Sequence, residues 1–295
     1  MRLHLVDGTY ELFRAHFSKR PDQTDPKGRD VKATTGVVSS ILALLDDPDE
    51  QVTHLAVAFD NPVRSFRNDL FDGYKTEEGV AEELLAQFDL VEVAMRAIGV
   101  VAWSMDRWEA DDALATAAAR WGGEVDQVRI LTPDKDLGQC IRGERVVQVD
   151  RMRKKLIDEA GLLALRGIVP ASIPDYLALV GDTADGIPGI KGFGEKTAAS
   201  LLREYVHVEQ IPARARDWKV SVRGADTLAP LLAASREEVL LYRKLTTLVT
   251  DVPLPGDLDS LRYRGVSTSF DAWCDEVLAP SAIRNAARAQ PTSSP

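Results

Sequence analysis

The chain is 295 residues long and carries 36 lysines and arginines against 46 aspartates and glutamates, a formal charge of −10. This length allows one or two domains with a sizeable core, and 45% apolar and 28% charged residues are ordinary for a globular protein. No apolar run approaches the roughly 20 residues of a membrane span, and the N-terminus becomes polar too early for a signal peptide. Cys140 and Cys274 suit neither a disulfide framework nor a zinc site. We therefore expect a soluble cytoplasmic protein, and its acidity argues mildly against a nucleic-acid partner.

The first half of the sequence alternates short apolar runs with segments of helical periodicity. The runs predict five strands, at Leu3–Val6, Leu55–Phe59, Val100–Trp103, Val128–Thr132 and Val146–Val149. Apolar residues at helical spacing predict helices between them, over Val37–Leu45, Leu84–Met95 and Leu114–Trp121. This alternation indicates an α/β fold with a parallel sheet buried on both faces, whose functional site lies at the carboxyl ends of the strands.

From about residue 158 the pattern changes to helices without strands. Glycine and proline separate four predicted helices, Asp158–Arg166, Ala171–Val180, Glu195–Tyr205 and Arg236–Leu248. Pro280–Pro295 is poor in large apolar side chains, so we expect a frayed tail there. The predicted domains are an α/β core over residues 1–165, a helical region over residues 166–265, and a C-terminal helix and tail over residues 266–295.

Acidic residues follow the predicted strands at the points where these strands end. Because the carboxyl ends of parallel strands meet at one edge of a sheet, we expect most of these carboxylates in one crevice. One aspartate at a strand end or helix start is by itself usually a turn former or a helix cap. As a set, however, they cannot all ionise in one pocket without cations, and oxygen ligands without histidine or cysteine favour Mg²⁺ or Mn²⁺ over Zn²⁺. The acids are Asp7, Asp60, Glu109, Asp111, Asp112, Asp134, Asp136, Asp182 and Asp185.

These carboxylates are enough to hold two divalent ions. Two such ions about 4 Å apart can clamp a phosphodiester, activate a water molecule and stabilise the leaving oxygen. Hydrolysis by this route needs no protein nucleophile, and the sequence contains no serine or cysteine triad signature to supply one.

A glycine-rich stretch, Gly186–Thr197, joins two of the predicted helices. It is not a dinucleotide fingerprint, because no strand precedes it. It is not a P-loop either, because Lys196 follows Glu195 rather than the second glycine of that motif. It can be a tight helix–helix turn, or its amides and the next helix N-terminus can receive a nucleic-acid phosphate. The two lysines in this stretch, Lys191 and Lys196, favour the second interpretation, a site for a nucleic-acid phosphate.

Basic residues are concentrated in two places. One is a dense run between residues 142 and 155, which is either a solvated face or a border of the predicted crevice. The other follows Asp60, where cations alternate with aromatic residues that can either stack on single-stranded bases or pack in the core. The members of this second group are Arg64, Phe66, Arg67, Phe71, Tyr74 and Lys75.

Seven motifs, taken in order along the chain, carry a family resemblance. They are Asp7-Gly8 with Arg14, Ala58-Phe59-Asp60, Ser65-Phe66-Arg67, Gly73-Tyr74-Lys75, Glu109-Ala110-Asp111-Asp112, Thr132–Leu137 and Gly181–Gly189. Together they resemble the bacterial 5′→3′ exonuclease and flap endonuclease family, which includes the N-terminal nuclease domain of DNA polymerase I. The resemblance extends to about residue 255, and because no polymerase domain follows, we expect a stand-alone nuclease.

The resemblance implies a PIN-like nuclease core followed by a helix–three-turn–helix DNA-binding domain. It also implies a phosphodiester hydrolase with two or three Mg²⁺ or Mn²⁺ ions, acting on DNA with 5′ ends or 5′ flaps in replication or repair. It leaves open whether DNA or RNA-primed 5′ ends are preferred.

Individual roles follow from the matched positions. A first metal cluster is implied for Asp7, Asp60, Glu109 and Asp111, and a second for Asp134, Asp136, Asp182 and Asp185. Lys75 resembles the residue that contacts the scissile phosphate, and Arg67 and Asp112 are expected beside it in catalysis. Tyr74 resembles a base-stacking residue, and Arg14 is expected to bind DNA. A hairpin that binds duplex phosphates, often together with K⁺, is implied for Gly189, Lys191, Gly192, Gly194 and Lys196.

One departure from the family pattern follows Lys75. The family usually continues with a second basic residue and a helical arch, whereas here Thr76-Glu77-Glu78-Gly79 follows and places Glu78 where an arginine is expected. A short, acidic arch raises an alternative: a structure-specific DNA-binding protein with weak or no cleavage, for want of a transition-state cation.

Two further alternatives are weaker. A phosphatase of the HAD type would need an aspartate at the position of Leu5. A PIN-type ribonuclease fits the core alone, but such proteins lack the hairpin over Gly186–Lys196.

Once nine acids are assigned to a metal centre, the net negative charge of the chain reflects mostly that unfilled centre rather than a surface that repels nucleic acid. Without the nine acids named above, 37 acidic residues stand against 36 basic ones. We therefore predict that DNA binding weakens sharply without divalent ions, because the unfilled centre repels phosphates. Titration of labelled 5′-flap DNA in Mg²⁺ and in excess chelator measures this, and equal affinity in both would contradict it.

Overall fold

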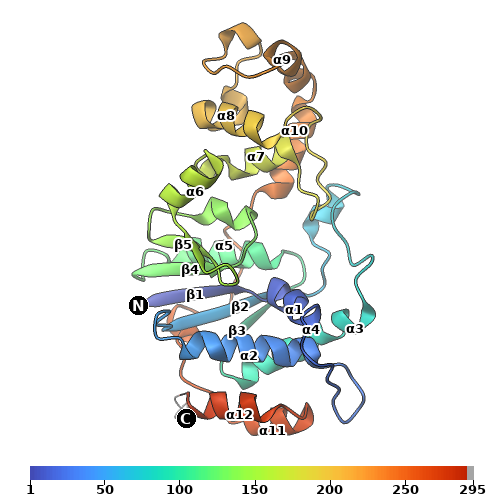
Figure 1. Cartoon of the computed structure of the whole chain (residues 1–295), viewed down its shortest axis with the longest axis vertical. Helices are drawn as coiled ribbons and strands as arrows, with labels where there is room; N and C mark the ends of the chain where they lie inside the picture. The colour runs from blue at the N-terminus through green and yellow to red at the C-terminus, as the bar shows by residue number, and fades with distance from the viewer. Residues whose placement is uncertain (291–295) are drawn as a thin grey trace.

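The structure, a computed structural model, describes residues 1–290 and is built around one six-stranded sheet (Figure 1). The strands lie in the order β3-β2-β1-β4-β5-β6, with β1 to β5 parallel and β6 antiparallel to β5. Their bounds are β1 Arg2–Asp7, β2 His54–Asp60, β3 Val101–Met105, β4 Gln127–Leu131, β5 Val146–Asp150 and β6 Lys155–Ile157. The five predicted strands are confirmed. The expectation of an entirely parallel sheet is wrong at its edge, where the short and largely exposed β6 carries no buried apolar run.

Helices cover both faces of the sheet. Alternate residues of the strands point to opposite sides, so that Val6 and Val57 join one apolar cluster while Leu3 and Leu5 join another. The first cluster is closed by α1, α2 and α4, and the second by α5. The helix bounds are α1 Gly8–His16, α2 Lys32–Asp46, α4 Gln87–Ala97 and α5 Ala110–Trp121.

Two of these helices differ from the prediction. The segment Leu84–Met95 was expected to form one helix, but α3 (Glu82–Leu85) ends before α4 begins. Helix α1 was not predicted, because it starts directly after β1 with no intervening turn, and the Asp7 side chain caps it by accepting from the Tyr10 amide at 2.8 Å.

The helical region has a core of its own and forms the upper part of the molecule in Figure 1. Its helices are α6 Glu159–Arg166, α7 Ile173–Val180, α8 Glu195–Tyr205, α9 Ala225–Ala234 and α10 Arg236–Thr246. Four of the five were predicted. The fifth, α9, contains Pro230 in its interior, which obscures its helical pattern.

After α10 the chain returns to the α/β core. Leu248, Val252 and Leu254 pack in the apolar cluster under α5. The last two helices, α11 (Phe270–Glu276) and α12 (Ser281–Arg288), lie at the opposite end of the molecule from the helical region, where α12 contacts α2 (Figure 1).

The expected frayed tail is therefore wrong for residues 281–288. Ile283 and Ala287 are buried on one face of α12, four residues apart, and alanine supplies helix propensity where large apolar residues are missing. Residues 291–295 of the predicted tail lie outside the described residues.

Among residues 1–290 no single helix is long and apolar enough to cross a membrane. The helices Glu159–Arg166 and Pro170–Val180 reach that length and composition only when counted together, across a bend of 50°.

The packing of α12 predicts a stability difference between two alanine variants. Ile283→Ala should lower the free energy of unfolding by about 2–4 kcal/mol, because it leaves a cavity against the core. The exposed Asn285→Ala on the same helix is the control and should change it by less than about 0.5 kcal/mol. Urea unfolding of both variants measures this, and equal stabilities would mean that α12 does not contribute to the core.

Candidate metal centre

The strand order reverses beside β1, which lies between β2 and β4. The chain builds β1, β2 and β3 outward in one direction and β4, β5 and β6 in the other. In a parallel sheet such a switch point opens a crevice at the carboxyl ends of the strands. Asp7 ends β1, Asp60 ends β2, and Asp134 follows β4, so three of the predicted metal ligands lie at this crevice.

Backbone amides and hydroxyls hold the first carboxylates in place. Asp7 accepts from the Thr132 hydroxyl at 2.9 Å, in addition to the Tyr10 amide. Asp60 accepts from the Ala110 amide at 2.6 Å, at the first residue of α5. Helices α1 and α5 thus both begin at the crevice, where their N-terminal dipoles stabilise negative charge.

Glu109 is oriented by three side chains. One of its carboxylate oxygens accepts from the Ser65 hydroxyl at 2.6 Å, and the other lies 3.1 Å from both the Tyr74 hydroxyl and the Lys75 ammonium. Asp111, two residues further along, is surrounded by the charges of Asp7, Asp60 and Asp134.

A second group of carboxylates comes from the short 3₁₀ helix η2 (Asp136–Cys140) and from the loop after α7. One oxygen each of Asp136, Asp182 and Asp185 lies within 4.8 Å of the others. The Oδ1 atom of Asp136 is buried and has no hydrogen-bond partner, so this member of the group has an unpaired acceptor. Three carboxylate oxygens with no nitrogen or sulfur ligand suit a hard divalent ion.

A close backbone contact joins the two groups. Gly186 has a φ of +74°, and a Cβ at this position would lie 2.1 Å from the carbonyl oxygen of Gly73. Beside this contact the Lys75 amide donates to the Asp185 carbonyl at 3.1 Å. The Lys75 ammonium lies 3.0 Å from the Asp185 carboxylate, so this one cation bridges Asp185 and Glu109.

The crowding of carboxylates changes their proton affinities. Burial, followed by the charge of Asp60 and other neighbours, raises the pKa of Asp7 to about 7, and burial and Glu109 raise the pKa of Asp60 to about 6. Burial and neighbouring carboxylates also raise the pKa of Asp111 and Asp136 well above the ordinary range. Without metal ions, the centre therefore holds protons that bound cations would displace.

Glu109 shifts in the opposite direction. Burial alone would raise its pKa, but Lys75, Arg67 and the Ser65 hydroxyl outweigh this and lower it. These partners therefore favour the ionised form of Glu109.

Arg67 and Asp112 lie behind this centre rather than in it. Arg67 is 1% exposed, and its guanidinium forms two hydrogen bonds to Asp112, at 2.7 and 2.8 Å. Asp112 also accepts from the amides of Glu109 and Val249. The guanidinium also lies 3.4 Å from the Glu109 carboxylate, so in this structure the buried pair supports Glu109, and the expected catalytic roles of Arg67 and Asp112 stay predictions.

The sequence shows that Arg67 stands among aromatic residues after a predicted strand. It does not show whether the Arg67 side chain points to solvent or into the protein. The same limit applies to Tyr74, which was expected to stack on a base. Its side chain is 3% exposed and points inward to Glu109, so its ring offers no face to DNA.

Arg14 lies in the last turn of α1 and is partly exposed. It pairs with Glu11 and donates to the Ser40 hydroxyl at 3.1 Å. A partly exposed guanidinium at this position is available to a nucleic-acid backbone, and its DNA-binding role stays a prediction.

The glycine-rich hairpin presents its polar residues to solvent. Ile190 and Phe193 are buried and anchor it to the helical core, whereas Lys191, Gly192, Gly194 and Lys196 are exposed. Gly194 caps α8 without any side-chain hydrogen bond, so the first amides of this 11-residue helix remain open. Gly189 has a φ of +68° and packs directly against the backbone of Gly181.

Sequence reasoning missed one residue of the centre. Lys135, between Asp134 and Asp136, places its ammonium 2.8 Å from the Asp182 carboxylate. The signal was present, because a lysine flanked by two predicted metal ligands can reach the same site.

Comparisons with known proteins give the family. The model of the 5′-3′ exonuclease N-terminal resolvase-like domain matches residues 2–165, and that of the 5′-3′ exonuclease C-terminal SAM fold matches residues 168–269. The chain belongs to the 5′-3′ exonuclease family.

Two relatives illustrate this family, and one solved structure shares the fold. A 5′-3′ exonuclease of Aquifex aeolicus is 30% identical over 263 residues, 89% of this chain and 86% of the relative. A DNA polymerase I of Rhizobium leguminosarum is 37% identical over 265 residues, 88% of this chain but only 26% of the polymerase. A bacteriophage T5 flap endonuclease, in a complex with DNA and metal ions, shares the fold with a TM-score of 0.62 at 18% identity, over 98% of this chain and 97% of the phage chain.

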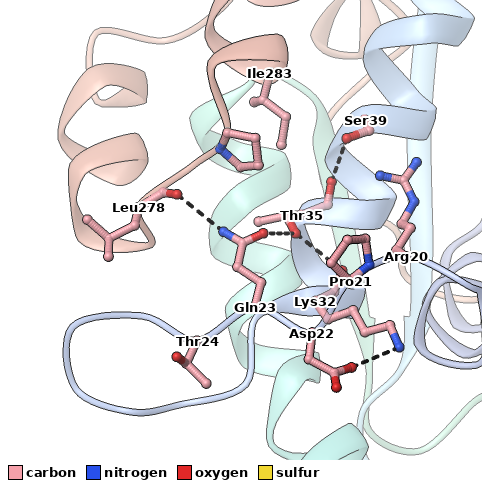
Figure 2. Close-up of a pocket in the computed structure, with 11 residues that line it drawn as sticks. Arg20, Pro21, Asp22, Gln23, Thr24, Lys32, Thr35, Ser39, Leu278 and Ile283 are labelled. Carbon is pink, nitrogen blue, oxygen red and sulfur yellow. Dashed lines mark hydrogen bonds and ion pairs between the residues drawn. The ribbon is translucent and has the colours of Figure 1, made fainter.

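A separate pocket lies away from the metal centre. It has a volume of about 500 Å³ and opens between the loop after α1, helix α2 and the C-terminal helices (Figure 2). Gln23 reaches across it and donates to the carbonyls of Val277 and Leu278 at 3.2 and 3.3 Å. None of the predicted site residues lines this pocket.

The raised pKa values of Asp7 and Asp60 predict a pH dependence of stability. A carboxyl whose pKa is higher in the folded than in the unfolded protein contributes stability at low pH, and this contribution is lost as the pH rises through the folded pKa. We expect the melting temperature of the metal-free protein to fall by several degrees between pH 6.5 and 8. Because ions replace the lost protons, Mn²⁺ should raise it more at pH 8 than at pH 6.5.

Thermal unfolding by circular dichroism, in chelator and in Mn²⁺, tests this dependence. Burial lowers the pKa of His4, so the effect of this histidine has the opposite sign, with stability gained as the pH rises. Asp7→Asn is the matched variant and should flatten the pH dependence. A metal-free protein whose melting temperature rises from pH 6.5 to 8 would contradict the account.

Proposed function

We propose that the protein is a divalent-metal-dependent 5′→3′ exonuclease and 5′-flap endonuclease, which hydrolyses phosphodiester bonds of DNA during replication or repair. The substrate is DNA with 5′ ends or 5′ flaps, and the ions are two Mg²⁺ or Mn²⁺. The observation that carries the proposal is the convergence of eight carboxylates from both parts of the chain at one edge of the sheet. They are Asp7, Asp60, Glu109, Asp111, Asp134, Asp136, Asp182 and Asp185.

The residues fall into two candidate ion sites. Asp7, Asp60, Glu109 and Asp111 would hold one ion, and Asp136, Asp182 and Asp185, with Asp134 beside them, would hold the other. When bound, the ions supply an activated water and charge stabilisation at the phosphate.

The protein's own residues orient and charge this centre. Ser65 and Tyr74 fix the direction of the Glu109 carboxylate. Lys75 lies between the two groups and keeps its proton at any ordinary pH, since burial lowers its pKa but Glu109 and other neighbours raise it well above the usual value. Once cations occupy the carboxylates, its ammonium is free to bind the phosphate that is to be cut.

The hairpin gives the substrate a second point of attachment. Exposed Lys191 and Lys196 flank the open amides at the start of α8, an arrangement suited to backbone phosphates of duplex DNA. A K⁺ ion at Gly189–Gly194 stays a prediction. The T5 protein of the same fold binds DNA and metal ions, which supports the same partners here.

A second candidate function rests on the segment after Lys75. Residues 76–81 form no helix, and α3 is only four residues long. The segment and α3 carry four glutamates and no basic residue, namely Glu77, Glu78, Glu82 and Glu83. An acidic rim of this kind repels a 5′ single strand, which favours a structure-specific DNA-binding protein with weak or no cleavage.

Asparagine at Asp182 tests the nuclease proposal. Asp182→Asn removes one charge from the second ion site but keeps the side-chain oxygen that accepts from the Ala184 amide, so the loop should remain folded. We expect cleavage of a labelled 5′-flap DNA to fall by at least about 10²-fold, since a catalytic metal supplies several kcal/mol. Asp226→Asn on α9, far from the centre, is the control and should cleave like the unchanged protein.

Binding and cleavage are followed in one assay, in Mg²⁺ and in Mn²⁺. Tight binding without product by the unchanged protein would favour the second candidate. Cleavage by Asp182→Asn at the unchanged rate, resistant to chelator, would refute the metal-dependent mechanism.

A further inference from the structure

Lys135 pairs with a carboxylate of the second ion site, as Lys75 pairs with one carboxylate of each site. It lies at the start of the η2 turn, with its ammonium 2.8 Å from Oδ2 of Asp182 and its side chain 32% exposed. The Asp182 side chain is only 7% exposed, so this ion pair is largely shielded from solvent on the Asp182 side. Both lysines thus pair with carboxylate oxygens that a divalent ion would take.

Few basic side chains pair with the carboxylates of the centre. In the described part of the chain, the basic side chains paired with predicted metal ligands are Arg67, Lys75 and Lys135. Arg67 is buried against Asp112 and cannot move to a substrate. The position where a second base was expected holds the exposed Glu78. Lys135 is therefore the one remaining cation of this set that can assist Lys75.

Metal binding would release Lys135. A divalent ion on Asp182 repels an ammonium about 3–4 Å away, and the ion also removes the charge that holds the lysine there. The backbone of Lys135 is fixed between Asp134 and Asp136, both at the centre, so the released ammonium stays at the rim of the site. A phosphate bound at the ions would then offer it an anionic partner, in addition to the charges of Asp134 and Asp136 beside it.

We propose that Lys135 is a second phosphate-binding cation of this centre, masked by Asp182 in the metal-free protein and exposed to substrate when a divalent ion binds. This rests on the proposed function for the presence of a phosphate between the ions. It adds a residue that takes the role left open at Glu78, and it couples DNA binding to metal binding through the protein itself.

Three variants separate this role from a structural one. Lys135→Met removes the charge and keeps the length of the side chain, Lys135→Arg keeps the charge, and Lys219→Met on the exposed surface of the helical region is the control. The first readout is DNA affinity for a labelled 5′-flap duplex, measured by fluorescence anisotropy in saturating Ca²⁺ and in chelator. The second is Mn²⁺ affinity without DNA, measured by electron paramagnetic resonance.

We expect Lys135→Met to weaken DNA binding about tenfold in Ca²⁺ and hardly at all in chelator, since one charge-assisted hydrogen bond is lost only when the ion is present. The same variant should bind Mn²⁺ as tightly as the unchanged protein or more tightly, because a competing cation is gone. Lys135→Arg should restore DNA affinity to within about threefold, and Lys219→Met should match the unchanged protein throughout.

The proposal would be overturned if Lys135→Met binds DNA normally in Ca²⁺. If Lys135→Met bound Mn²⁺ more tightly but DNA with unchanged affinity, Lys135 would only fill the ion site of the metal-free protein and would not bind phosphate. These readouts require no turnover, so a protein that never cleaves DNA would disprove the proposed function and still test Lys135.

Discussion

Mutual repulsion among eight carboxylates at one edge of a sheet is the constraint on which the rest of this structure depends. The arrangement is costly in the metal-free protein, where burial and like charges raise the pKa of Asp7 to about 7. Each compensating feature serves to offset that cost. Helices α1 and α5 begin at the crevice, hydroxyls and amides donate to the acids, and Lys75 and Lys135 neutralise the two groups from different loops.

The second ion site also requires that the two parts of the chain keep a fixed relation. Asp136 comes from the α/β core and Asp182 and Asp185 from the helical region, so a relative shift of a few ångström would dismantle the site. Two contacts prevent this. One is the close approach of Gly186 to Gly73. The other is the buried Arg67, whose guanidinium binds Asp112 in the core and donates to the carbonyl of Leu245 at 2.7 Å, at the end of α10. Both Arg67 and Asp112 belong to the core, so their pairing fixes the guanidinium, and the hydrogen bond to Leu245 then ties the core to the helical region.

The parts of this architecture that follow from periodicity could be predicted from the sequence. Strand positions and the acids at strand ends are encoded locally, and the rule that parallel strands end at one edge brings Asp7, Asp60 and Asp134 together. Side-chain direction after the strand is not encoded in this way. Arg67 lies in a short 3₁₀ helix, and Tyr74 lies beside the contact between Gly73 and Gly186. The groups that these two side chains meet are far away in sequence, and so their inward orientation could not be predicted. Helix α12 was missed because its buried face consists of one isoleucine and small alanines, which carry little signal until α2 is placed opposite.

Anomalous scattering from Mn²⁺ in crystals of the protein tests the central claim most directly. The account predicts two ion positions at the carboxyl edge of the sheet, one ligated by Asp7, Asp60, Glu109 or Asp111 and the other by Asp136, Asp182 and Asp185, with the Lys135 ammonium displaced from Asp182. Ions bound elsewhere, or an edge that stays free of metal at millimolar Mn²⁺ and pH 8, would contradict it.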